Sequence, residues 1–212
     1  MSSDTPLENS LEAKRKSTLR LRAVLAGGLV LGIGATVTLA SWQDSEYASH
    51  QFEASTFGTE SSTVTGGWAS NDSAPGAALV FTGGAALPMV SQYAWINIRT
   101  TANSTTNGTV TLASSSASGT LAPELEYRAV RTPSSGTACD ATVFVGSPTF
   151  IAGGAATYLP VTSVPASAVA SAITSPSGQL RYCFDIRVRA AANNNKQGTT
   201  GQVTWLFSAI SN

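Results

Sequence analysis

The residue types that most often perform acid–base or nucleophilic chemistry are scarce in this chain. His50 is the single histidine of the sequence. A Ser-His-Asp triad would have to use it, yet no serine lies in a Gly-x-Ser-x-Gly turn of the kind that exposes a nucleophile. A catalytic zinc ion takes about three protein ligands, so one histidine does not make such a site. We therefore expect His50 to be a partly exposed strand residue, and we predict no metal site.

A pair of carboxylates, Glu124 and Glu126, offers the other chemistry worth testing. On a strand, residues two positions apart lie on the same face roughly 7 Å from each other, a separation that would suit glycoside hydrolysis. Catalytic pairs, however, normally come from different strands across a cleft, whereas neighbouring carboxylates on one strand are usually a solvated face. Asp44 and Glu46 are arranged no better. We expect no catalytic residue, no cofactor and no enzymatic activity.

The two cysteines, Cys139 and Cys183, lie 44 positions apart (183 − 139), with no Cys-x-x-Cys motif and no histidine near either. Two thiols are too few for a structural zinc site, which takes about four ligands. In an exported protein the natural interpretation is one disulfide, and closing a loop of this length stabilises a fold by roughly 3–4 kcal/mol in the chain-entropy model. Two separate buried thiols are the alternative.

Composition excludes several classes of function. Charged residues make up 11% of the 212 residues, hydrophobic residues make up 42%, and the formal net charge is zero. A disordered chain would combine low hydrophobicity with high net charge, so this chain is expected to fold. Proteins that bind nucleic acids carry a basic patch or stripe, for which so weak a charge gives no basis. The Gly-Gly pairs lack the lysine and the following helix of a phosphate-binding loop.

The first forty residues have the order of a secretory signal. Residues 1–22 are polar and end in a basic cluster, and residues 23–40 form an uncharged hydrophobic segment. A basic region followed by an apolar run and small residues is typical of a signal peptide, and here it predicts cleavage between Ala40 and Ser41. A retained transmembrane anchor is the alternative, although about 25 Å of helix would be short for a membrane span.

The residues around this junction follow a distinctive order. A Gly/Ala-rich apolar run ends at Ala40, and Trp42 and then Asp44 follow it. A short β-prone stretch closes with the phrase Phe-Glu-Ala-Ser-Thr-Phe at residues 52–57. This order resembles the start of proteins with the alternate, SipW-type signal peptide, the family that includes TasA and camelysin, where the closing phrase is like Phe-x-Ala-Gly-Thr-Leu. Serine stands here in place of the usual glycine. The resemblance covers residues 20–60.

The resemblance implies export through the Sec translocon and processing by a SipW-like signal peptidase. In TasA-like members it also implies a jelly-roll domain that assembles into the extracellular fibres of a biofilm matrix. The long polar extension before the basic cluster resembles the actinobacterial members. Camelysin-like relatives have been associated with metalloprotease activity, but this chain has no His-Glu-x-x-His motif. On this resemblance, the protein is expected to be secreted or held at the cell surface.

Residues 41–212 predict a single domain, because short apolar or alternating stretches are separated by Gly, Ser, Asn and Pro clusters. The expected fold class is all-β, an antiparallel jelly-roll-like β-sandwich preceded by an N-terminal signal or transmembrane helix. The expected strands are Ser49–Phe57, Ala77–Phe81, Gln92–Thr100, Thr109–Ala113, Leu125–Arg131, Thr142–Val145, Gln179–Arg189 and Gln202–Ile210. The expected loops are Thr100–Thr109, Ala191–Gly201 and a flexible, low-complexity stretch at Ser114–Gly119. The Ala- and Ser-rich stretch Ser163–Ser175 is expected to be a loop, with a short helix as the alternative.

The clearest pattern is in residues 180–188 and 202–208, where apolar and polar residues alternate. Period two puts one face of a strand in the core and the other towards water. Cys183 falls on the polar face, so a disulfide would sit at the edge of the core or bridge to a covering loop. The arginines of this face are expected to form a solvated stripe that discourages edge pairing. They are Arg181, Arg187 and Arg189.

The segment after the cleavage site is expected to be a detachable first strand. It extends from Ser41 to Phe57, is β-prone, and carries a single charge, Glu53, in its last seven residues. Such a segment would complement the sheet of a neighbouring molecule, a known mode of recognition. Its anchoring side chains would be those of Trp42, Phe52 and Phe57.

Two functions follow from these patterns. The first is an exported structural protein of the cell envelope or extracellular matrix that forms fibres by strand exchange. Its partners would be further copies of itself, with the Sec translocon and the signal peptidase during export, and no nucleic acid. The second is a secreted or surface-tethered binding module, of the adhesin or carbohydrate-binding type, that would use the loops Thr100–Thr109 and Ala191–Gly201. In both, the N-terminal segment is the only membrane contact.

Overall fold

The computed structural model describes residues 15–25, 49, 53–83 and 85–212, which belong to two units, Met1–Phe52 and Glu53–Asn212. In the first unit, residues 15–25 are helical with exposed side chains. Among the described residues, no helix is both long enough and apolar enough to cross a membrane. The predicted cleavage site between Ala40 and Ser41 lies outside the described residues.

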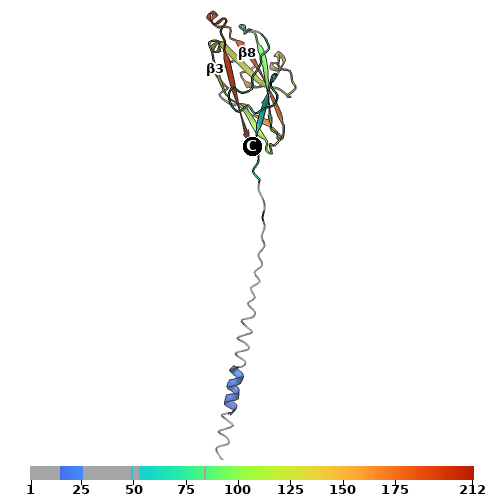
Figure 1. Cartoon of the computed structure of the whole chain (residues 1–212), viewed down its shortest axis with the longest axis vertical. Coiled ribbons are helices and arrows are strands. Elements are labelled where there is room, and N and C mark those ends of the chain that lie inside the picture. The colour runs from blue at the N-terminus through green and yellow to red at the C-terminus, as the bar shows by residue number, and fades with distance from the viewer. Residues whose placement is uncertain (1–14, 26–48, 50–52, 84) are drawn as a thin grey trace, which may run out of the picture. The chain divides into compact units, whose positions relative to one another are not determined.

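The second unit consists of two antiparallel sheets (Figure 1). Sheet A has the strand order β1-β2-β8-β4-β5, with β6 paired to β4, and sheet B has the order β7-β3-β9. The elements are β1 (Thr59–Ser62), β2 (Gln92–Thr100), β3 (Gly108–Ser118), the 3-10 helix η1 (Ala122–Glu124), β4 (Leu125–Arg131), η2 (Ala141–Phe144), β5 (Thr149–Ala152), β6 (Leu159–Pro160), β7 (Ser171–Ile173), β8 (Gln179–Val188), η3 (Asn194–Lys196) and β9 (Gln202–Ser211). The predicted all-β, two-sheet architecture is confirmed.

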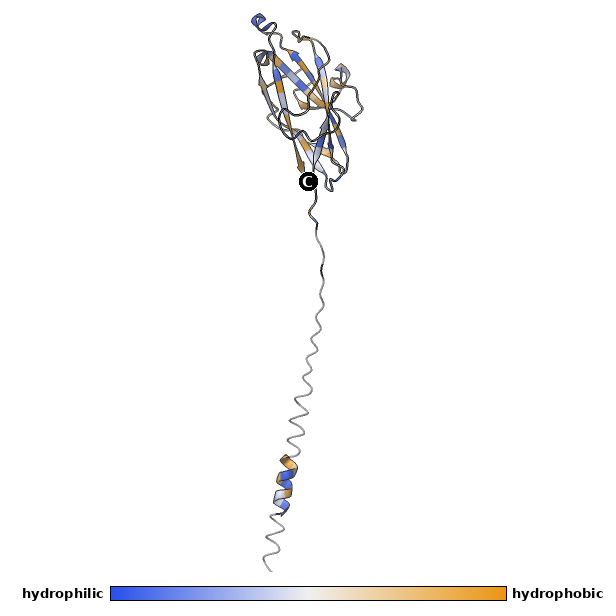
Figure 2. Cartoon of the chain, viewed as in Figure 1, coloured by the Kyte–Doolittle hydropathy of each residue, from blue (hydrophilic) through white to orange (hydrophobic). Residues whose placement is uncertain are grey.

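The main core lies between the two sheets because apolar side chains recur at every second position of the long strands (Figure 2). β8 is the central strand of sheet A and pairs with β2 on one side and β4 on the other. Its Tyr182 and Phe184 are buried and face β9, where Phe207 lies 4.7 Å from Tyr182 and Trp205 lies 4.5 Å from Phe184, measured between ring centroids. Each aromatic pair stabilises by roughly 0.5–1.5 kcal/mol beyond its buried area.

Two buried tyrosines, Tyr127 of β4 and Tyr182 of β8, carry their hydroxyl groups into this core. The Tyr127 hydroxyl donates a 2.8 Å hydrogen bond to the carbonyl oxygen of Ser163. Burial raises the pKa of each hydroxyl from 10.0 to about 12, because a phenolate would lose its hydration there. Both side chains are therefore neutral in the folded protein at physiological pH.

β3 and β9 form the longest strand pair, from Gly108 opposite Ser211 to Ser118 opposite Gln202. The register shifts between Leu112 and Ser114, which marks a bulge. The prediction that Ser114–Gly119 is a flexible link is wrong, because β3 continues through it to Ser118. The serine run has little apolar surface of its own, and the backbone hydrogen bonds of β9 hold it in place.

Three predicted strands are wrong. In the stretch predicted at Ser49–Phe57, the described residues carry no strand, and β1 starts only at Thr59. Residues 77–81 also carry no strand. In the stretch Thr142–Val145, all but the last residue belong to the 3-10 helix η2, and Val145 is its C-cap. The helix starts here because the carboxylate of Asp140 accepts hydrogen bonds from the backbone N–H of Thr142 at 2.8 Å and from its hydroxyl at 2.6 Å. These capping hydrogen bonds outweigh the β propensity of the residues in this stretch.

The sequence pattern did not predict three short strands, β5, β6 and β7. They have four, two and three residues, too few to show an alternation. β7 lies inside Ser163–Ser175, where a loop or a short helix was expected. The expected loops Thr100–Thr109 and Ala191–Gly201 are confirmed over residues 101–107 and 191–201, which contain no strand, but the 3-10 helix η3 lies inside the second.

The outer face of sheet A is covered by the segments on either side of β5, residues 132–148 and 153–158, which together we call the outer cover. Cys139 of the outer cover forms a disulfide with Cys183 of β8, with the two Cα atoms 5.4 Å apart. Around this bridge, Val130 and Phe144 form a second, smaller apolar cluster with Cys183. The predicted disulfide is thus present and reaches a covering loop, but the face that carries Cys183 is buried and does not face water.

Candidate functional site

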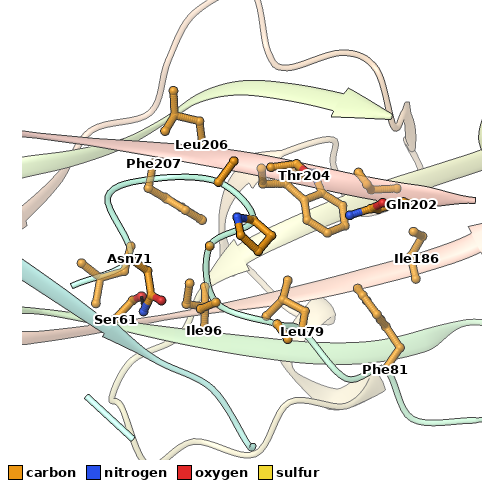
Figure 3. Close-up of a pocket in the computed structure, with 18 of the residues that line it drawn as sticks. Ser61, Asn71, Leu79, Phe81, Ile96, Ile186, Gln202, Thr204, Leu206 and Phe207 are labelled. Carbon is orange, nitrogen blue, oxygen red and sulfur yellow. Dashed lines mark hydrogen bonds between the residues drawn. The ribbon is translucent and has the colours of Figure 1, made fainter. Parts of the chain in front are cut away.

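An open crevice with a volume of about 1020 Å³ lies between the sheets, on the side formed by β1, β2 and β9 (Figure 3). It exists because the two sheets differ in width: sheet B has three strands, whereas sheet A has more. Beyond β9, the inner face of sheet A therefore has no strand opposite it. The space that a fourth strand of sheet B would fill is left to loop residues.

Apolar side chains line the inside of the crevice. Ile96 of β2 and Ile186 of β8 line the side of sheet A, and Trp205 and Phe207 line the side of β9. Figure 3 shows Phe207 on the crevice side of β9 and Leu206 on the opposite side of the same strand. The Trp205 ring is held by Phe184 and by Tyr127, whose ring centroid lies 5.4 Å from its own. The floor of the crevice is therefore built from packed core side chains.

Residues 71–81, which we call the strap, cross the mouth of the crevice. Leu79 and Phe81 of the strap contact the core, and the ring centroid of Phe81 lies 6.2 Å from that of Trp205. At one end of the strap, Nδ2 of Asn71 donates a hydrogen bond to the hydroxyl of Ser61 in β1. Just after the other end, the N–H of Thr82 donates a hydrogen bond to the carbonyl oxygen of Tyr93 in β2. Between these ties, residues 77–81 make no backbone–backbone hydrogen bond with the described part of the chain. Packing of two side chains holds this part of the strap, a feature of segments that open at low free-energy cost.

β9 borders the crevice with a free edge. It pairs with β3 along its length, and no strand among the described residues pairs with its other edge. Its ten residues contain neither a charge nor a proline, the features that usually protect an edge strand from pairing with other chains. The outermost strands of sheet A, β1 and β5, have only four residues each. β9 is a long, unprotected edge in the described part of the sandwich, together with residues 111–118 of β3, which lie beyond the short pairing of β3 with β7.

The crevice has a polar rim. On the side of β1, the hydroxyl of Ser61 accepts a 2.9 Å hydrogen bond from Nδ2 of Asn71. The neighbouring Glu60 forms a 2.8 Å ion pair with Arg99 of β2 on the other face of sheet A. Gln202 and Thr204 of β9 lie along the opposite rim (Figure 3). An apolar floor with a polar rim suits an extended segment that buries alternate side chains and leaves the others near water.

The two carboxylates considered for catalysis bind arginines separately. Glu124 ends the 3-10 helix η1, so the expectation that both lie on one strand is wrong. Its carboxylate accepts a 2.7 Å hydrogen bond from Nε of Arg189, which lowers the pKa of Glu124. Glu126 of β4 accepts a 2.7 Å hydrogen bond from Nε of Arg187. This pairing gives no shared acid–base site.

The predicted arginine stripe is not a solvated edge. Arg181 and Arg187 belong to β8, the central strand of sheet A. Arg181 donates a 2.8 Å hydrogen bond from Nε to Oδ1 of Asn97, and its guanidinium lies 4.1 Å from the centroid of the Trp95 ring. These arginines connect neighbouring strands and do not repel a further strand.

Asp185 is the buried charge of the same face. Its Oδ2 accepts hydrogen bonds from Nε of Arg128 at 2.9 Å and from the hydroxyl of Tyr158 at 2.7 Å, while Asp185 itself is 0% exposed. Burial raises the pKa of the Tyr158 hydroxyl, so that it stays a donor. Because Tyr158 belongs to the outer cover, this network fastens the outer cover to sheet A.

The structure leaves most of the predicted strand-exchange segment untested. Trp42 and Phe52 lie outside the described residues, as do His50 and the cleavage residues. Phe57 is described and packs against the core of its own domain, next to Gly108. The backbone of the preceding residue, Thr56, accepts a 2.9 Å hydrogen bond from the N–H of Thr105. Any segment free for exchange therefore ends before Thr56.

Sequence reasoning did not foresee the crevice, the strap or the free edge. The one usable signal was the lack of charge in residues 202–211. Within the described ranges, no group of three or more His, Cys, Asp or Glu residues is arranged to hold a metal ion. Comparisons with protein-family models and with curated proteins give no match for this chain.

Proposed function

We propose that this chain is an exported structural protein of the cell envelope or extracellular matrix, and that copies of it assemble into fibres by strand exchange. In each step, residues 41–55 of one copy pair with the free edge of β9 in the next copy and fill its crevice. The observation that carries the proposal is the uncharged ten-residue edge of β9 beside an apolar crevice of about 1020 Å³.

The geometry of the acceptor supports strand addition. A strand added to β9 gains main-chain hydrogen bonds along roughly 33 Å of edge, and its alternate side chains enter the crevice. Residues 77–81 of the strap occupy part of that space without backbone hydrogen bonds. Their displacement costs the packing of Leu79 and Phe81, which apolar side chains of the incoming strand would replace.

The sequence of the donor segment supports the same step. From residue 48 to 55, Ala48, His50, Phe52 and Ala54 alternate with polar residues, which is the period of a strand with one buried face. The anchored position of Thr56 leaves these residues directly before the sandwich. Phe52 is the largest apolar side chain of the alternating face and is the proposed anchor in the crevice of the acceptor.

Export is proposed on the N-terminal pattern and on the disulfide. A basic region, an apolar run and the junction Ala40–Ser41 resemble a SipW-type signal, and a disulfide such as Cys139–Cys183 persists in oxidising compartments. In this proposal the Sec translocon and a SipW-like peptidase handle the chain, the sandwich is of the jelly-roll type, and the protein has no enzymatic activity.

The test uses two variants of the exported protein that differ in one position. Phe52→Asp places a charge on the face proposed to enter the crevice, whereas Gln51→Asp places the same charge on the opposite face. Both positions precede the sandwich. Sedimentation velocity and electron microscopy should show filaments for the wild type and for Gln51→Asp, and monomers for Phe52→Asp. Deletion of Ser41–Glu46 should also abolish filaments. Filaments of unchanged length with Phe52→Asp would refute strand exchange.

The crevice also favours a second candidate, a secreted or surface-tethered binding module of the adhesin or carbohydrate-binding type. Its volume is in the range of small-ligand sites, and it combines an apolar floor with polar groups at the rim. This candidate predicts that the exported protein forms no filaments at any concentration and that Phe52→Asp has no effect on its state. The sedimentation experiment above therefore separates the two candidates.

A further inference from the structure

The distribution of charge over the two sheets is unequal. The three strands of sheet B contain no Asp, Glu, Lys, Arg or His. The strands of sheet A carry charges on β1, β2, β4 and β8. These are Glu60, Arg99, Glu126, Arg128, Arg131, Arg181, Asp185 and Arg187. In a protein with few charges, one whole layer of the described sandwich is thus uncharged.

The outward side chains of sheet B form what we call the charge-free face. On either side of the bulge they alternate with the core residues of β3 and β9. The face consists of Thr109, Thr111, Ser114, Ser116 and Ser118 from β3, and of Thr204, Leu206, Ser208 and Ile210 from β9. No part of the outer cover lies here, since that segment packs on sheet A.

The charge-free face has a raised side and a low side. On β9, Leu206 is 55% exposed and Ile210 is 63% exposed, and these two large apolar side chains form a ridge. On β3, Ser114 stands opposite Leu206 and Ser116 stands opposite Thr204, so the neighbouring strand forms a shelf of small hydroxyl side chains. A ridge beside a shelf is the shape that fits a copy of itself turned by a two-fold rotation.

We infer that the charge-free face is a homotypic contact, in which two copies pack face to face with the ridge of each on the shelf of the other. In this contact Leu206 of one copy covers the β3 serines of the second copy, and the reverse holds by symmetry. The contact uses side chains on the outside of sheet B. It does not use the backbone edge of β9, although three of its residues, Thr204, Leu206 and Ser208, also border the crevice.

The chemistry of the face favours a second copy over other partners. A charged partner would have to bury its charges against a surface that offers no countercharge, which costs several kcal/mol for each ion. An identical face meets neither like-charge repulsion nor an unpaired charge. Its serine and threonine hydroxyls can both donate and accept hydrogen bonds across the contact.

The size of the face sets the strength of the contact. Two strands of about ten residues, with the edge of a third, present roughly 400 Å² per copy, or about 800 Å² in total. Stable interfaces bury about 1,200 Å² or more, so a single contact should be weak and reversible. In a fibre, where many copies repeat the face, the same weak contact would act many times and join fibres side by side.

The test uses the exported protein that lacks Ser41–Glu46, in which strand exchange is expected to be blocked. Sedimentation equilibrium is recorded up to about millimolar protein, at low salt and at 1 M NaCl. A closed two-fold contact gives a monomer–dimer equilibrium without larger species. Because no charge takes part, high salt should not weaken the dimer. Leu206→Asp on the ridge and Ser116→Arg on the shelf should each weaken dimerisation at least tenfold.

The matched control is Val145→Asp, which adds a charge at a side chain that is 69% exposed in the outer cover, away from sheet B. It should dimerise as the parent does. Thermal unfolding of each variant confirms that the sandwich is intact, since the altered side chains point outward. A parent protein that stays monomeric at the highest concentration, or a Leu206→Asp variant that dimerises like the parent, would overturn the inference. If the protein that lacks Ser41–Glu46 still forms long filaments, the proposed strand exchange is wrong. In that case Leu206→Asp and Ser116→Arg still test whether the charge-free face forms a contact.

Discussion

The disulfide between Cys139 and Cys183 should contribute a large part of the stability of the sandwich. It ties the outer cover to the central strand of sheet A and closes a loop with a sequence separation of 44 residues. Replacing both cysteines by alanine removes the tie. It also removes two sulfur atoms from the small cluster around Val130 and Phe144.

The magnitude follows from the loop length. In the chain-entropy model, a loop of this size gives an entropy change of about −13 cal/mol/K for the unfolded chain, or about 4 kcal/mol at 25 °C. A domain the size of Glu53–Asn212 unfolds with an entropy of roughly 340 cal/mol/K near its midpoint. Loss of the bridge should therefore lower the melting temperature by about 12 °C.

The assay is thermal and urea unfolding, followed by circular dichroism, of the wild type, the reduced wild type and the double variant Cys139→Ala/Cys183→Ala. The reduced wild type keeps both sulfur atoms, so its difference from the oxidised protein measures the loop constraint alone. Reducing agent should leave the double variant unchanged. A loss of less than about 1 kcal/mol on reduction would refute the reasoning, as would a native protein with two free thiols.

Three further predictions concern the core. Because the pKa of Tyr127 and of Tyr182 is about 12 when folded and near 10 when unfolded, stability is complete below pH 10 and falls as pH rises towards 12. Each tyrosine accounts for about 3 kcal/mol of this loss, and Tyr127→Phe should reduce the slope in alkaline urea titrations. Asp185→Ala leaves Arg128 without its countercharge, so the free energy of unfolding in urea should fall by about 3–5 kcal/mol. Glu60→Ala breaks the more exposed ion pair with Arg99 and should lower the same free energy by less than about 1 kcal/mol. Equal losses for the two variants would show that burial does not set the cost. Gly108→Ala brings a Cβ against the carbonyl oxygen of the paired strand and a phenylalanine ring, and should lower stability by roughly 1–3 kcal/mol; an unchanged melting temperature would show that the contact relaxes freely.

The alternation of side chains predicts the strands that are half buried and long. Residues 92–100 and 125–131 were placed at their observed ends, and β8 and β9 were placed within one residue. In each, the period of two extends over enough residues to exclude a helix. The same pattern predicts that Cys183 lies on the face away from the main core. It does not predict that the outer cover buries this face, because a covering loop has no period of its own.

The errors have local or global physical causes. At residues 142–145 a single carboxylate, that of Asp140, bonds the backbone and makes a 3-10 helix from residues with high β propensity. At residues 77–81 the apolar run packs into a space between the sheets and finds no strand to pair with. The crevice itself depends on the unequal widths of the two sheets, which is a property of the whole topology and of no single segment.

The most direct test of the account is to isolate the protein from the envelope and the culture medium of cells that export it. Its N-terminus is then determined by mass spectrometry, and its assembly state by electron microscopy of the same sample. We expect a chain that begins at Ser41 and is found in filaments. An intact N-terminus in the membrane fraction would contradict the proposed export and cleavage, and a chain that begins at Ser41 but stays monomeric would contradict the structural role.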